Sequence, residues 1–140
     1  MNPFDKAWAL LKMPYHGTSS KRWEEIQQTG SLKPSSDAMG ALRVWFTGNP
    51  NEALYHSMDA VNTDREKGLQ SHPVIIHSKP TQEMEAGNDN PRFWTSETDV
   101  PSDTFSQVWS DENYKPAESG QERIDSARRY RTELEEMERE

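Results

Sequence analysis

Histidines are the groups in this sequence best able to exchange protons near neutral pH, and of the four present His16 has the most suggestive neighbours. It precedes Gly17 in the segment Tyr-His-Gly-Thr at residues 15–18, which we expect to be a short strand running into a turn. At a strand end the imidazole can project from the sheet, and glycine lets a ligand approach the backbone closely. His16 and Gly17 are therefore the first candidates for a binding site.

Other common chemistries have no support in the sequence. His56, His72 and His77 lack the paired spacing of a metal site, and a chain with no cysteine has no thiolate nucleophile and no cysteine-based zinc site. The P-loop, the dinucleotide G-x-G-x-x-G, the H-E-x-x-H and the G-x-S-x-G patterns are absent. We therefore expect no metal.

The composition limits the architecture of the chain and the classes of partner that it can bind. A chain of 140 residues predicts one compact domain, and 31% hydrophobic residues with 5 Trp, 4 Tyr and 4 Phe predict a thin aromatic core. The net charge of −8 argues against general nucleic-acid binding and against anionic membranes. Neither a signal peptide nor a membrane span is indicated, and the cytoplasm is the simplest expected location.

The first half of the chain predicts helices and strands that position His16. Asn2-Pro3 predicts a helix to about Lys12, and Ser20 predicts the cap of a second helix that ends at Gly30. The segment 31–40 is expected to be a loop. In the strand 42–47, alternation predicts that one face carries Leu42, Val44 and Phe46, and the other face carries Arg43, Trp45 and Thr47.

The second half predicts the rest of an α+β fold. A helix capped at Asn49 has an apolar stripe of Leu54, Met58 and Val61, and residues 74–77 predict a central strand buried on both faces. A polar loop is expected over 79–92, followed by strands at 93–95 and 104–109 with Val100-Pro101 between them. Together these elements predict a split, mostly antiparallel sheet flanked by helices.

The composition changes after Pro116, which predicts a domain over 1–116 and a charged amphipathic helix over 117–140. Residues 119–122 have capping-box spacing. The apolar stripe of this helix consists of Ile124, Ala127, Tyr130, Leu134 and Met137. Such a sparse stripe must pack on the domain, on a partner or on a second copy of the chain.

These segments resemble, in order and spacing, the motifs of the ADP-ribosyltransferase superfamily. That superfamily has a strand with His-Gly-Ser/Thr, an Ile…Gly-Leu segment, a strand like Val-Tyr-Phe-Thr, a helix with Ala…Tyr, and a later strand supplying an acid. The counterparts of the first four features are residues 15–18, the helix ending at Gly30, Val44-Trp45-Phe46-Thr47, and the helix with Ala53 and Tyr55. The strand 73–77 follows that helix. The similarity extends from Tyr15 to about Pro101, and Ser31 interrupts the Gly-Leu step.

The resemblance implies transfer of ADP-ribose from NAD to an acceptor that is unidentified, a protein or a small molecule. It implies that His16 hydrogen-bonds the adenosine ribose and that Gly17 offers its backbone to the nicotinamide amide, with Thr18 and Thr47 in the cofactor site. The superfamily's stacking Tyr is replaced here by Trp45. Indole retains the π face that stacks on a pyridinium ring, although it lacks the phenol hydroxyl.

The resemblance also implies an acid that stabilises positive charge at the anomeric carbon as nicotinamide leaves. Glu97 is the first candidate, since it ends the expected late strand shortly before Val100-Pro101. Asp89 is the second candidate, because a branch that inactivates rifamycin antibiotics uses an earlier Asp.

Two other functions remain open. RNA 2′-phosphotransferases also have Tyr-His-Gly-Thr and a late Trp followed by Val-Pro, as in Trp94 to Pro101. That branch, however, has a second His where Trp45 stands and several Arg residues for phosphate, whereas this strand holds only Arg43. The third possibility is a non-catalytic protein that binds NAD or ADP-ribose, with the C-terminal helix docking a partner.

Overall fold

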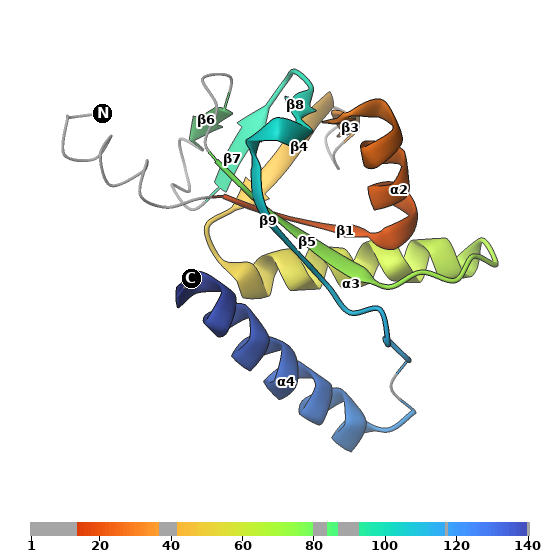
Figure 1. Cartoon of the computed structure of the whole chain (residues 1–140). Coiled ribbons are helices and arrows are strands. Elements are labelled where there is room, and N and C mark those ends of the chain that lie inside the picture. Colours follow the sequence, from red (N-terminus) through yellow and green to blue (C-terminus); the bar gives the residue numbers. More distant parts are fainter. Residues whose placement is uncertain (1–13, 37–41, 80–83, 87–92, 117, 140) are drawn as a thin grey trace.

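The computed structural model describes residues 14–36, 42–79, 84–86, 93–116 and 118–139 (Figure 1). The helix expected over residues 2–12, the turn at 88–91 and the candidate acid Asp89 lie outside these residues. The described elements form an α+β fold with an antiparallel sheet, as the sequence predicts. None of the described helices is long and apolar enough to cross a membrane.

One antiparallel sheet organises the molecule, with strand order β6-β7-β4-β1-β5-β9 and with β3 paired to β4. Its strands are β1 (Tyr15–Ser19), β3 (Ser35–Ser36), β4 (Leu42–Thr47), β5 (Pro73–Ser78), β6 (Met84–Ala86), β7 (Phe93–Ser96) and β9 (Phe105–Ser110). A second small sheet pairs β2 (Ser31–Leu32) with β8 (Val100–Pro101), and a 3-10 turn follows at Ser102–Thr104. The strands β2, β3 and β6 were expected to be loop, because each is too short to show an alternating pattern.

Three helices flank the sheet in the part of the chain that the structure describes: α2 (Ser20–Thr29), α3 (Pro50–Glu66) and α4 (Gly120–Arg139). Ser19 rather than Ser20 caps α2, since the Ser19 side chain accepts the Arg22 N–H. Gly30 ends that helix in the left-handed conformation at φ 79°, as its position predicts. Asn49 caps α3 by accepting the Asn51 N–H.

The sheet is split between β1 and β4. Within the described strands, β1 pairs with β5 at five positions but with β4 at Tyr15–Thr47 alone. The other end of β4 pairs with β3 through Arg43 and Leu42. The intervening residues 44–46 face residues 16–18 of β1 without a continuous ladder, and we call this place the β1–β4 split.

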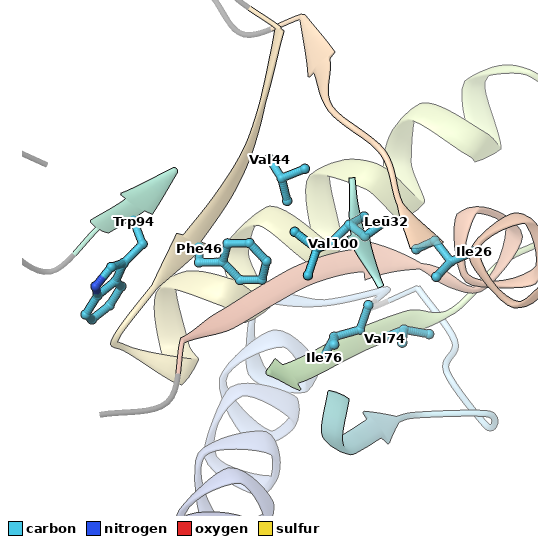
Figure 2. Close-up of a cluster of buried hydrophobic side chains, with 8 residues drawn as sticks. All are labelled: Ile26, Leu32, Val44, Phe46, Val74, Ile76, Trp94 and Val100. Atoms are coloured by element: carbon cyan, nitrogen blue, oxygen red, sulfur yellow. The ribbon is translucent and has the colours of Figure 1, made fainter. Parts of the chain in front are cut away.

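The main core fills one face of the sheet, beneath α2 and the β2–β8 pair (Figure 2). Its buried side chains come from six elements and are Ile26, Leu32, Val44, Phe46, Val74, Ile76, Trp94 and Val100. Leu42 was expected on this face but is 62% exposed, because β4 begins beyond the edge of this cluster. The buried strand predicted over 74–77 is confirmed for residues 74–76, whereas His77 is half-buried.

The opposite face packs against α3 and α4, so the sheet lies between two layers (Figure 1). Val61 of the predicted stripe is buried, but Leu54 and Met58 are only half-buried. The other buried residues of α3 are Ala53, Ser57, Ala60 and Asp64. Small side chains face the sheet because β1 and α3 approach to backbone contact at Gly17. Leu54 and Met58 therefore lie to one side of the face that is buried.

The C-terminal helix packs on the sheet through two residues of its predicted stripe. Leu134 is buried with Tyr15, Ala53 and Ile75, and Tyr130 is buried against the edge of the Trp109 ring. The Tyr130 hydroxyl donates to the Asp111 carboxylate, to which Arg129 also forms an ion pair at 3.1 Å. Ile124 and Ala127 do not pack on the domain and are exposed, and the Met137 side chain lies outside the described residues. The helix therefore docks by its second half.

Candidate functional site

His16 occupies the β1–β4 split. Its Nδ1 lies 2.7 Å from the carbonyl oxygen of Trp45, a residue in the stretch of β4 that β1 does not pair. The imidazole also lies beside the Phe46 ring, with centroids 5.6 Å apart. The His16 side chain thus hydrogen-bonds a β4 carbonyl that would otherwise pair with the backbone of a neighbouring strand. This hydrogen bond fixes the orientation of the imidazole ring.

The surroundings keep the His16 imidazole neutral. Burial lowers its pKa to about 4, the hydrogen bond to the Trp45 carbonyl opposes that change, and the charges of Arg22 and His56 lower the pKa further. Because a carbonyl only accepts, Nδ1 carries the proton at neutral pH. The other ring nitrogen, Nε2, is then an acceptor. The structure therefore presents a fixed hydrogen-bond acceptor at the split.

Gly17 lies inside β1 rather than at a turn, and α3 accounts for the absence of a side chain there. A Cβ at this position would lie 1.8 Å from the Ala53 carbonyl oxygen and 2.8 Å from the Ser57 nitrogen. The neighbouring Thr18 is buried, and its carbonyl accepts the Ser57 hydroxyl at 2.6 Å. Glycine is therefore required for the close packing of helix on strand, whatever else its backbone contacts.

Trp45 has a partly exposed side chain at the split. The residue is 42% exposed, and its indole forms a T-shaped pair with the Phe93 ring, with centroids 6.4 Å apart. Neighbouring residues of a strand alternate in direction, so the indole leaves β4 on the face opposite to Phe46 and His16. His16 thus contacts the Trp45 carbonyl rather than its ring, and the indole remains available for stacking.

Thr47 holds the beginning of α3. Its hydroxyl donates to the Glu52 carboxylate at 2.9 Å and accepts the Asn49 N–H at 3.1 Å. Because Thr47 is also the residue that pairs with Tyr15, it joins the two strands of the split to the first turn of the helix.

Glu97 lies apart from this group. It is exposed, in a bend one residue beyond β7, where Ser96 pairs with Val44. The backbones of Glu97 and His16 are therefore two strands and about three residues apart, on the order of 14 Å in a flat sheet. The structure brings His16, Gly17 and the Trp45 carbonyl together, but it does not bring Glu97 to them.

Three charged or titratable residues near the split escaped the sequence interpretation. Arg22 of α2 and His56 of α3 are both close enough to His16 to lower its pKa, and Glu52 precedes His56 by one helical turn. The spacing of Glu52 and His56 by four residues, on a predicted helix, was the available signal for a shared face. No local sequence pattern identifies Arg22, because its proximity to His16 depends on how α2 packs against the sheet.

Comparisons with known proteins add no further evidence on function. No protein-family model matches the chain, and neither a curated protein nor a solved structure matches it. Among the described residues, no group of three or more His, Asp or Glu side chains is arranged to hold a metal ion. The case for a function therefore depends on the residues around His16 and on the order of the sequence motifs.

Proposed function

We propose that this domain binds NAD and transfers its ADP-ribose group to an acceptor, in the manner of the ADP-ribosyltransferases that its motifs resemble. The observation that carries the proposal is the neutral His16, oriented by the Trp45 carbonyl at the split between two strands. An Nε2 acceptor of this kind suits a ribose hydroxyl, which donates one hydrogen bond.

The charges near His16 support a dinucleotide ligand. The chain carries a net charge of −8, yet Arg22 lies near the imidazole. A guanidinium group there can pair with a pyrophosphate, which the average surface of this protein repels. Arg22 is exposed, so its side chain is accessible to such a ligand.

The exposed indole of Trp45 supports the nicotinamide end of the same proposal. Nicotinamide in NAD is a cationic ring, and indole is the aromatic side chain that interacts most strongly with a cation. The 42% exposure of Trp45 leaves surface for such a contact. In this proposal His16 and Gly17 hold the ligand at the split, and Trp45 stacks on the leaving group from the opposite face of β4. Thr18 and Thr47 support the strands that carry these residues.

Calorimetric titration of NAD into the wild-type protein and into His16→Ala tests the proposal. Loss of one or two hydrogen bonds should weaken binding by about 1–3 kcal/mol, which is roughly a factor of 5 to 150 in Kd. Half-buried His72, whose backbone pairs with Ser20 beyond the far end of β1, offers the matched control His72→Ala with unchanged affinity. Equal affinities of wild type and His16→Ala, or binding by neither, would refute the proposal.

A second candidate is a non-catalytic protein that binds NAD or ADP-ribose. The exposed position of Glu97, apart from His16, favours this candidate, since the acid expected from the sequence lies away from the rest of the site. Binding of NAD without any release of nicotinamide would select it over the transferase.

A further inference from the structure

Glu52 and His56 occupy one flank of the first two turns of α3, four residues apart. The buried face of this helix lies against β1, with the Ala53 carbonyl in contact with the Gly17 backbone. The opposite flank carries Leu54, which packs with the cluster of Leu134 and Trp109 on the far side of β1 from β4. The Glu52–His56 flank therefore lies on the β4 side of β1, on the same face of the sheet as the Trp45 indole.

One hydrogen bond and one electrostatic effect agree with this placement. Thr47, which pairs with Tyr15 at the closed end of the split, donates its hydroxyl to the Glu52 carboxylate at 2.9 Å. One turn further along the helix, His56 is near enough to His16 to affect its protonation. Glu52 is half-buried, and its carboxylate is held in position by Thr47.

We infer that Glu52, rather than Glu97, is the carboxylate that faces the reacting ribose of NAD at the split. The inference rests on the proposed function and adds to it a catalytic residue that the sequence motifs do not indicate. Glu52 belongs to the helix whose next residue contacts Gly17, whereas Glu97 lies two strands away from β1 on an exposed bend.

The chemistry requires one negative charge near the anomeric carbon. The bond between that carbon and the nicotinamide nitrogen breaks, and its electron pair stays on the nitrogen, which makes nicotinamide neutral. With water as acceptor, a lone pair on the water oxygen forms the new bond to the anomeric carbon, and one proton leaves to bulk water. Positive charge develops on the sugar ring in the transition state, and a fixed carboxylate stabilises that charge more than it stabilises the ground state.

The test compares release of nicotinamide from NAD by the wild type, Glu52→Gln and Glu97→Gln, with Glu66→Gln as a matched exchange on the exposed last turn of α3. Glutamine retains an oxygen that accepts from Thr47, so the helix start is preserved. We expect Glu52→Gln to lower the rate by about 10²-fold or more with the Kd for NAD within about threefold, and Glu66→Gln to keep the wild-type rate.

Rescue by formate is a measurement that a purely structural role of Glu52 would not affect. Adding sodium formate to Glu52→Ala should raise the rate of nicotinamide release at least about tenfold, because a small carboxylate restores the charge without restoring the side chain. Wild-type turnover by Glu52→Gln, or loss of turnover in Glu97→Gln alone, overturns the inference and leaves the proposed function standing. Failure of formate to increase release also overturns it. A wild type that releases no nicotinamide overturns both.

Discussion

Replacing Gly17 by alanine should destabilise the fold more than any other glycine-to-alanine change among the described residues. The added Cβ would lie 1.8 Å from the Ala53 carbonyl oxygen, whereas ordinary contacts begin at 3.4 Å, so α3 would have to move by about 1.6 Å. The obstacle is the helix backbone at both Ala53 and Ser57, and not the end of a flexible side chain.

The size of the effect follows from this geometry. Forcing one extra methyl group into a packed interior commonly costs about 1–3 kcal/mol, and an obstacle made of backbone places Gly17→Ala at or above the upper end, about 3 kcal/mol. For a chain of this length that corresponds to a fall in Tm of roughly 10 °C. Differential scanning calorimetry at fixed protein concentration measures it.

Two controls separate packing from backbone conformation. A Cβ added at Gly120 would meet nothing within 4 Å, so Gly120→Ala should change Tm little or raise it slightly. Gly30 also has open space but sits at φ 79°, so Gly30→Ala should cost about 1–2 kcal/mol through strain alone. A Gly17→Ala protein that melts within about 2 °C of wild type would refute the reasoning about helix and strand packing.

Three further predictions concern the helix α4, the protonation of His16 and the ring of Trp45. Leu134→Ala should lower the free energy of unfolding in urea by about 2–5 kcal/mol because Leu134 is fully buried, whereas Ile124→Ala should change it little because Ile124 is exposed. Equal effects of the two substitutions would show that α4 does not dock as described. The pKa of His16 is lowered in the folded state, so its neutral form contributes stability that is complete above pH 6.5 and is lost as the pH falls toward 4. His16→Gln should flatten the plot of unfolding free energy against pH in this range, and an unchanged slope would contradict the burial argument. Trp45→Ala should weaken NAD binding by about tenfold and Trp45→Tyr should preserve it, as measured by calorimetry; equal binding by Trp45→Ala would exclude stacking.

The elements that could be predicted from sequence are those with strong local signals. The terminal glycine of α2, the Asn-Pro start of α3 and the β-branched strand β5 depend on residues close together in the chain. Apart from Val61, the buried face of α3 was missed because it depends on backbone contact with β1, which favours alanine and serine over larger residues. Short strands such as β6 were missed because their pairing partners alone define them.

In the candidate site, too, the sequence identifies residues, whereas their contacts depend on the tertiary structure. His16 and Trp45 could be found from a motif, but their actual contact, a ring nitrogen on a backbone carbonyl, depends on where β1 leaves β4. The position of Glu52 depends likewise on tertiary structure, since the hydrogen bond from Thr47 and the packing of α3 on β1 hold it beside the end of β4. Glu97 fits the sequence motif, yet the register of β7 on β4 sets it apart from His16.

Release of nicotinamide from NAD by the purified wild-type protein tests the central claim most directly. The account predicts saturable release, with one ADP-ribose group appearing in product for each nicotinamide formed, and a large loss of turnover in Glu52→Gln at nearly unchanged NAD affinity. Absence of both NAD binding and nicotinamide release, from protein shown to be folded by its melting transition, would contradict it.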